Sequence, residues 1–261
     1  QGMGMRVAIV GEEAVGMPAA YFDELEMRND IVLLLSTLGD TPWFKMTQRH
    51  SDRIWLFARA DARPSKPLLP DDPSPARQFR LVDLVLLHHG GERQVTSTAE
   101  WMDAAEATRV FHWNQMDEND ARRLSRTMSG KSVGLVLSGG GARAYAHIGV
   151  MRALREANCP VDFIGGASMG AIVGAAIACG WDDEEIHRRI YQAFVETNPL
   201  SDYRLPVVGL VKGHKVDARL KEHFGDRLIE DLPIPFFAVS TNLTQGTFKV
   251  HTQGLLREAL R

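Results

Sequence analysis

Two glycine-containing turns, each placed after a strand-like run, constrain the fold of this chain more than any other feature. Gly139-Gly140-Gly141-Ala142-Arg143 follows the run 133–137, and Gly166-Ala167-Ser168-Met169-Gly170 follows the run 161–164. Between the two turns there is room for one helix and one strand, which makes a single βαβ unit. Because such crossovers are right-handed and join parallel strands, we expect both turns at the carboxyl ends of strands about 4.8 Å apart.

This pair of turns is typical of an enzyme that attacks an acyl group with a serine. In G-x-S-x-G the serine sits on a strained strand-to-helix turn that exposes its Oγ, so Ser168 is the candidate nucleophile. The N–H groups of Gly139, Gly140 and Gly141 form the candidate oxyanion hole, since a turn without Cβ atoms lets the backbone approach a carbonyl under attack. The two turns together predict acyl transfer or ester hydrolysis.

Taken alone, each turn has a second interpretation. Residues 166–180 are rich in Gly and Ala, so the serine motif also fits a close-packed helix start without chemistry. The glycine turn also fits a phosphate-binding turn. A P-loop is excluded because no Lys-Ser or Lys-Thr pair follows, and the acidic ribose ligand of a dinucleotide site has only weak candidates in Glu156 and Asp162.

Two polar residues follow the glycines. His147 lies on a helix face with Tyr145, Ile148 and Met151, which favours a hydrogen-bonded core histidine over a general base. Arg143 stands at the mouth of the glycine turn, where a guanidinium either holds the loop through carbonyl bonds or steers a phosphate headgroup. The pattern favours the loop-supporting role slightly.

The segment Leu137-Ser138-Gly139-Gly140-Gly141-Ala142-Arg143-Ala144-Tyr145-Ala146-His147-Ile148-Gly149-Val150, followed by Gly166-Ala167-Ser168-Met169-Gly170, resembles patatin-like phospholipases. The likeness is to the neuropathy-target-esterase branch and its bacterial relatives, and it covers about residues 131–261. It implies a three-layer α/β hydrolase domain with a mostly parallel sheet. It also implies a glycine-loop oxyanion hole, a serine nucleophile and an aspartate base from a later Asp-Gly-Gly/Ala motif, without a histidine.

The sequence departs from that family pattern at two places. Ala144 replaces the more usual glycine, which lies past the main donors. No aspartate after Ser168 is followed by glycine, and the chain starts with Gln1 rather than methionine. We therefore expect a fragment, incomplete at its C-terminus, whose catalytic aspartate lies beyond Arg261 and which alone has little activity.

Residues 1–128 read as a separate domain that precedes the patatin-like domain 129–261. Strand-like runs at 6–10, 31–35, 53–58, 81–87 and 109–113 alternate with helical stretches, which predicts a doubly wound parallel sheet like that of nucleotide-binding folds. A proline-rich loop, 64–75, interrupts the alternation. The first turn, 11–17, lacks a lysine and carries Glu12-Glu13, so the domain is expected to be a degenerate, structural relative of nucleotide folds.

Composition limits the other functions. A net charge of −3 gives no overall basic field for nucleic acid, and nine histidines show no metal-binding spacing. We expect neither a metal nor a cofactor. Cys159 and Cys179 are too few for a disulfide framework, and no apolar run is long enough to span a membrane. The expected location is the cytoplasm, peripheral at the membrane, and an upstream anchor stays open.

Two further segments have open interpretations. The basic cluster Arg122, Arg123, Arg126 and Lys131 fits either cations at a helix C-terminus on a solvated face or a contact with anionic lipid. The apolar stretch 199–213 fits either a lid near the site or a covering of the core.

The leading hypothesis is a serine esterase that hydrolyses fatty-acyl esters of phospholipids or lysophospholipids at a transient membrane contact. The family resemblance adds cyclic-nucleotide-binding domains upstream in the parent chain. Two alternatives remain, an acyltransferase with the same serine chemistry and a catalytically silent regulatory or lipid-binding module.

Overall fold

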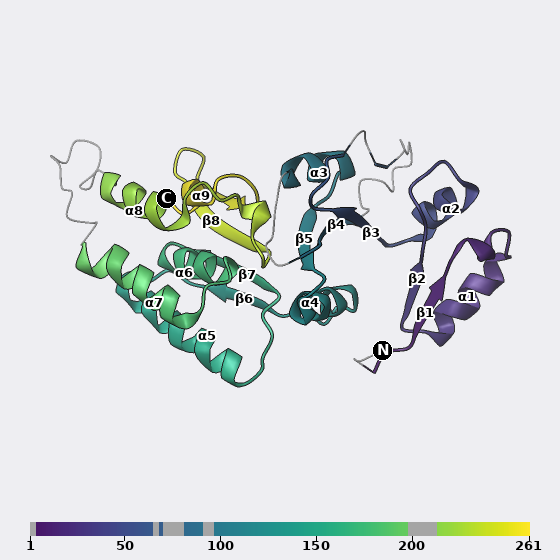
Figure 1. Cartoon of the computed structure of the whole chain (residues 1–261), viewed down its shortest axis with the longest axis horizontal. Coiled ribbons are helices and arrows are strands. Elements are labelled where there is room, and N and C mark those ends of the chain that lie inside the picture. Colours follow the sequence, from purple (N-terminus) through teal and green to yellow (C-terminus); the bar gives the residue numbers. More distant parts are fainter. Residues whose placement is uncertain (1–3, 65–67, 70–80, 91–96, 198–212) are drawn as a thin grey trace.

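The computed structural model describes residues 4–64, 68–69, 81–90, 97–197 and 213–261 (Figure 1). Strands and helices alternate along these segments as the sequence predicts. The strands are β1 (Val7–Val10), β2 (Ile31–Leu34), β3 (Arg53–Arg59), β4 (Leu81–His88), β5 (Arg109–Asn114), β6 (Gly134–Leu137), β7 (Phe163–Ala167), β8 (Phe236–Asn242) and β9 (Thr247–His251). The helices are α1 (Ala19–Arg28), α2 (Pro42–His50), α3 (Thr98–Ala105), α4 (Glu118–Met128), α5 (Ala146–Glu156), α6 (Met169–Ala178), α7 (Asp183–Tyr191), α8 (His214–Phe224) and α9 (Leu256–Ala259).

The strands of the first half are parallel, but they form two sheets instead of the single sheet expected from the sequence. β1 pairs with β2, and a separate sheet has the order β3-β4-β5. The β1–β2 pair has a core of its own, because Trp43 of α2 is 1% exposed and packs against it. The Trp43 indole also donates a hydrogen bond to the carbonyl of Leu35 at 2.7 Å, which fixes α2 over this pair.

Helices cover both faces of the β3–β5 sheet. Leu84 and Leu86 pack with Trp101 of α3 on one face. Val85 and Phe111 pack with Leu124 of α4 on the other face. Residues that alternate along β4 therefore bury themselves on opposite sides, which is the doubly wound arrangement that the alternation of strands and helices predicts.

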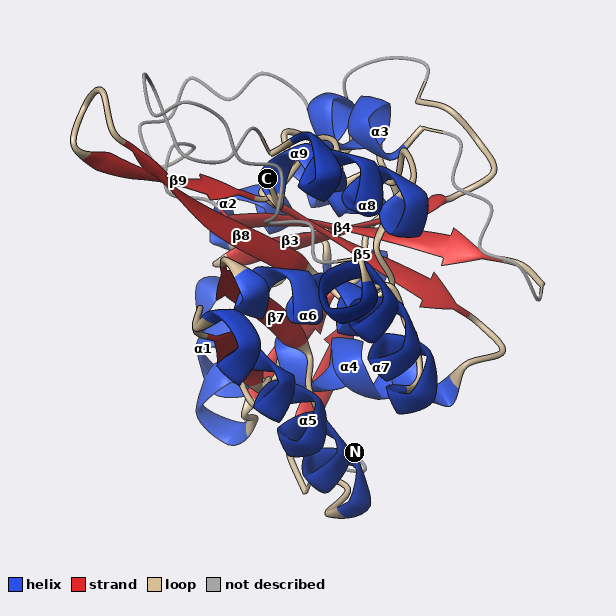
Figure 2. Ribbon diagram, turned by 90° about the vertical axis from the view of Figure 1, so that its left-hand side faces the viewer, coloured by secondary structure: helices blue, strands red, loops and turns tan. Residues whose placement is uncertain are grey.

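The second half is built on a mostly parallel sheet, as the family resemblance implies. β6, β7 and β8 are parallel neighbours, and β9 returns antiparallel to β8. The central helix α6 is buried along most of its length, since its small side chains let it pack against all three parallel strands. One hydrophobic core joins α5, α6, α7 and α8, and the β8–β9 hairpin extends away from the helices (Figure 2).

Helix α4 lies where the β3–β5 sheet and the β6–β9 sheet meet (Figure 1). The side chain of Arg126 is 20% exposed and pairs with Asp162, and that of Arg123 is 12% exposed and pairs with Asp120. The lipid-contact interpretation of this basic cluster is therefore wrong for both residues, because their charges are satisfied inside the protein. Sequence reasoning missed this because Asp162 lies 36 residues beyond Arg126 and belongs to no recognisable motif.

Some predictions fall wholly or partly outside the described residues. Most of the proline-rich loop 64–75 and nearly all of the apolar stretch 199–213 belong to segments that the structure does not describe. The boundary placed between residues 128 and 129 falls in the connection from α4 to β6, and the division into two domains stays a prediction.

Candidate active site

The two turns of the βαβ unit lie against each other. β6 and β7 pair in parallel with Leu137 opposite Gly166, so the segments that follow them leave the same edge of the sheet. A Cβ placed on Gly139 would lie 3.1 Å from the Cβ of Ser168 and 3.2 Å from the carbonyl oxygen of Ala167. The glycine turn and the serine turn are therefore in direct contact, as their spacing predicts.

Ser168 occupies the strained turn that joins β7 to α6. Its backbone has φ 52° and ψ −132°, a left-handed φ that a residue with a Cβ adopts only when its surroundings impose it. The residue is exposed, and among the described residues its hydroxyl has no hydrogen-bond partner. This is the strand–turn–helix setting in which a serine presents its Oγ to a substrate.

The two glycines of G-x-S-x-G are required by steric contact. A Cβ on Gly170 would lie 2.4 Å from the carbonyl oxygens of both Leu137 and Ser138. A Cβ on Gly166 would lie 2.7 Å from the backbone nitrogen of Ala171. The absence of side chains at these positions lets the first turn of α6 pack onto the end of β6, which brings the serine to the glycine turn.

Backbone donors without acceptors surround the serine. Within the described chain, the N–H groups of Gly139, Gly140 and Gly141 have no acceptor, and the same is true of Met169 and Gly170 at the start of α6. The positive end of the α6 dipole lies at the same place. Together these groups can stabilise a negatively charged oxygen beside Ser168. Sequence reasoning missed Met169, although the residue after the nucleophile is a general oxyanion donor on strand–turn–helix sites.

The helix that the sequence predicts between the two turns does not start directly at the glycines. A 3₁₀ turn, η3 (Gly141–Tyr145), comes first, and α5 begins only at Ala146. The N–H of Arg143 is used within this turn, where it donates to the carbonyl of Gly140 at 3.2 Å. A tight first turn of this kind is common at helix N-termini.

His147 anchors the start of the glycine turn. Its Nε2 lies 2.9 Å from the carbonyl oxygen of Ser138, and because a carbonyl only accepts, the imidazole is the donor. The prediction of a hydrogen-bonded histidine is confirmed, although the side chain is half-buried at the edge of the site instead of lying in the core. A histidine whose Nε2–H is committed to a backbone carbonyl cannot accept the serine proton at that nitrogen.

Arg143 is an open cation at the glycine turn. The residue is exposed, and no side-chain hydrogen bond or ion pair holds it among the described residues. The loop-supporting role favoured from the sequence is therefore not seen, and the guanidinium is free to meet an anion that approaches the site.

The first turn of the N-terminal half has its own internal anion. The carboxylate of Glu13 accepts the N–H of Gly11 at 2.8 Å. This bond holds the pKa of Glu13 below its usual range. The backbone donor that would receive a phosphate in a working nucleotide fold is thus occupied by a side chain of the turn itself.

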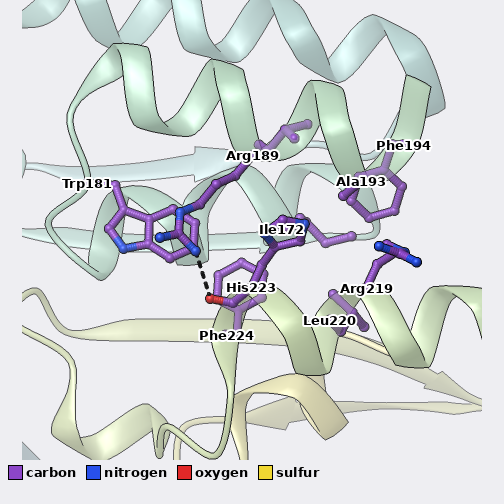
Figure 3. A pocket seen from close by; sticks show the side chains of 10 residues that line it. Ile172, Trp181, Arg189, Ala193, Phe194, Arg219, Leu220, His223 and Phe224 are labelled. Carbon is purple, nitrogen blue, oxygen red and sulfur yellow. Dashed lines mark hydrogen bonds between the residues drawn. The ribbon is translucent and has the colours of Figure 1, made fainter. Parts of the chain in front are cut away.

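A small hollow lies between α6, α7 and α8, on the side of α6 marked by Ile172 (Figure 3). Arg189 and Trp181 lie at one end, with the guanidinium 4.4 Å from the centre of the indole ring, and His223 lies near the middle. Nε2 of His223 is buried, and no partner for it exists in the described chain. The enclosed room is about 10 Å³, enough for about one water molecule, so we assign no ligand to it.

Two features are absent from the described residues. No group of three or more His, Cys, Asp or Glu side chains is placed to hold a metal ion. No helix in the same segments combines the length and the apolar character needed to cross a lipid bilayer.

Comparison with known proteins agrees with the geometry of the two turns. The family model for patatin-like phospholipases matches residues 135–261. Patatin-like phospholipase domain-containing protein 7 of Rattus norvegicus is 29% identical over 275 residues, which cover 93% of this chain and 20% of the relative. The human patatin-like phospholipase domain-containing protein 6 is 29% identical over 277 residues, with the same two shares.

A bacterial relative has a higher identity over a shorter stretch. An uncharacterized NTE family protein of Mycobacterium tuberculosis is 41% identical over 138 residues, which cover 53% of this chain and 24% of the relative. This chain thus spans about a fifth to a quarter of the length of these relatives. Residues 135–261 match the patatin-like phospholipase family, and the relatives of the chain support the neuropathy-target-esterase-like branch of that family.

Proposed function

We propose that this chain carries the nucleophile and the oxyanion hole of a serine ester hydrolase that acts on lipids. Ser168 is the nucleophile, and the N–H groups of Gly139, Gly140 and Gly141 hold the oxyanion. The observation that carries the proposal is the contact of Gly139 with Ser168, with unpaired backbone donors on both sides of a free hydroxyl. We add the N–H of Met169 to the proposed oxyanion hole because it directly follows the serine.

In the proposed reaction, Oγ of Ser168 attacks the acyl carbonyl carbon as its proton passes to a base. The carbonyl oxygen becomes an oxyanion that the glycine-turn donors stabilise, the alcohol leaves with a proton, and water then hydrolyses the acyl-enzyme. Each oxyanion donor contributes most when it is fixed before the reaction, because the site then needs no reorganisation. The hydrogen bond from His147 to Ser138 and the packing at Gly170 supply that rigidity.

The family resemblance implies that the base is an aspartate in an Asp-Gly motif. No such pair follows Ser168 in this sequence, and we assign no residue of the chain to the role. His147 is a poor substitute, since its Nε2 is already bonded to the carbonyl of Ser138.

The proposed substrates are fatty-acyl esters of phospholipids or lysophospholipids at a membrane surface. The names of the relatives support a phospholipid. The open guanidinium of Arg143, next to the glycine turn, supplies a cation for the phosphate of the headgroup.

Labelling with a fluorophosphonate tests the nucleophile in the full-length protein. We expect one adduct per molecule on Ser168, found by intact mass and peptide mapping, and none in Ser168→Ala. Ser240 is the matched control, because its Oγ lies 2.7 Å from Nε2 of His251 and therefore resembles an activated serine on the neighbouring strand. Ser240→Ala should label like the wild-type protein.

The outcomes separate the alternatives. A folded wild-type protein that takes no label contradicts the hydrolase and supports a catalytically silent lipid-binding module. Labelling of Ser168 with transfer of the acyl group to an added alcohol in preference to water supports an acyltransferase.

A further inference from the structure

Asp162 ties together the starts of the two strands that carry the candidate site. It comes just before β7, is 0% exposed, and one of its carboxylate oxygens accepts the N–H of Val133 at 3.0 Å. In return, the N–H of Asp162 donates to the carbonyl of Val133 at 2.8 Å. Val133 directly precedes β6, so this reciprocal pair fixes which residues of β6 and β7 lie opposite each other.

The register of these strands depends on contacts such as this pair of hydrogen bonds. β6 and β7 are short, and they contain Gly134, Gly165 and Gly166, which offer no side chain to resist slippage. A slip of one residue moves one strand about 3.3 Å along the other. The oxyanion donors would then no longer face the carbonyl on Ser168, since the useful donor distances span only about 2.7–3.1 Å.

The cation that pairs with Asp162 comes from the first half of the chain. Arg126 of α4 contacts both carboxylate oxygens of Asp162, through Nε at 2.9 and 3.1 Å and through a terminal nitrogen at 2.6 Å. A buried carboxylate without its cation is strongly unfavourable, so Asp162 holds the register only while Arg126 is in place. The next residue also contacts the first half of the chain. The ring of Phe163 packs edge-on against the ring of Phe111 of β5, with 5.9 Å between the ring centres.

We propose that Arg126 is a positioning residue for the reaction at Ser168. It acts through Asp162 and Val133, which set the register of β6 against β7 and thereby align the glycine turn with the serine. The inference rests on the proposed role of Ser168, and it makes the junction around α4 part of the support of the site.

The test compares variants of the full-length protein by the rate of fluorophosphonate labelling per folded molecule, at a temperature well below unfolding. Arg126→Met should label at least tenfold more slowly and lose kcat on a short water-soluble ester, with KM nearly unchanged. Arg122→Met is the matched control, because Arg122 lies one turn earlier on α4, is 59% exposed and pairs with Glu118 of the same helix. It should stay within twofold of the wild-type rate.

A second variant separates positioning from general destabilisation. In Arg126→Met/Asp162→Asn no charge is left unpaired, and the amide oxygen can still accept the N–H of Val133. Labelling should recover to within about threefold of the wild-type rate.

The failures of the two proposals are distinguishable. If Arg126→Met lowers only the melting temperature and labels at the wild-type rate per folded molecule, the residue is structural and the inference is overturned. If the wild-type protein itself takes no label on Ser168, the proposed function is contradicted. The positioning role of Arg126 depends on that function and is then contradicted as well.

Discussion

The imidazole of His147 donates a hydrogen bond to the carbonyl oxygen of Ser138 across the glycine turn, with 2.9 Å between nitrogen and oxygen. The bond joins the residue before the glycines to the first turn of α5 and so closes residues 138–147 into a ring. A loop held at both ends has fewer conformations in which its N–H groups turn away from Ser168. We infer that the histidine stabilises the shape of the proposed oxyanion hole without taking part in proton transfer.

His147→Phe should therefore slow the reaction without abolishing it. Phenylalanine keeps the ring but cannot donate to Ser138, and the loss of one hydrogen bond worth about 1 kcal/mol corresponds to about a fivefold decrease in kcat. Steady-state kinetics on a short water-soluble ester measure the change. His147→Gln retains a side-chain donor and is the control. Its kcat should lie between those of the wild-type protein and His147→Phe. A loss of several thousandfold in His147→Phe would instead identify a general base.

The packing of α6 onto β6 gives a second prediction, at Gly170. Gly170→Ala should destabilise the fold by about 3 kcal/mol or more and abolish labelling of Ser168, because the new Cβ lies 2.4 Å from two backbone carbonyl oxygens that cannot both move. Urea unfolding and the labelling rate measure both effects.

Gly149→Ala is the matched control in the neighbouring helix α5. Apart from the backbone of its own helix, no atom lies within 4 Å of its added Cβ, and alanine is the better helix former, so this variant should gain about 0.5–1 kcal/mol. Equal effects at the two glycines would contradict the steric explanation.

The sequence predicts the contact between the two turns better than it predicts the pairing of the sheets. The spacing of the two turns was sufficient to place Gly139 against Ser168, because one crossover helix leaves only one arrangement of two parallel strands. The separation of β1–β2 from β3–β5 was not predictable, since it depends on Trp43 closing a local core. The alternation of strands and helices in the sequence predicts which segments are extended. It does not predict which strands pair with each other.

The ion pair between Arg126 and Asp162, which joins the two halves, could not be predicted for a different reason. The sequence places Arg126 in a basic cluster and offers Asp162 only as a weak candidate for an acidic ribose ligand. Only the packing of α4 beside β7 brings the two charges together. Tertiary pairs of this kind leave no local pattern, whereas Met169 follows from its place after the serine.

Arg143 gives a prediction about substrate preference. Because its guanidinium is exposed and unpaired within the described chain, Arg143→Met should raise KM for a phosphate-bearing lysophospholipid by about tenfold, as expected for the loss of one charge-assisted contact of about 1.4 kcal/mol. Hydrolysis of an uncharged ester of the same acyl group should stay unchanged. An equal loss on both substrates would assign the residue to the loop instead of the headgroup.

His223 gives a prediction about stability and pH. Burial lowers the pKa of this imidazole, and although the charge of Glu222 acts against the shift, the charges of Arg189 and Arg219 add to it. In the unfolded chain the side chain takes up a proton near its usual value of about 6.5, whereas the folded protein resists that proton. The unfolded state therefore binds more protons over this interval, and stability falls as the pH drops from about 6.5 toward the lower pKa of the folded state.

His223→Phe removes the titrating group and keeps an aromatic ring in the hollow beside Phe224. The wild-type protein should lose more stability than the variant between pH 7.5 and pH 5.5, measured as the midpoint of urea unfolding at each pH. The pH-dependent part of the difference between the two proteins should be close to zero at pH 7.5, where the histidine is mostly neutral in both the folded and the unfolded wild-type protein. A difference that stays constant across the interval would mean that the folded protein protonates His223 as readily as the unfolded chain does.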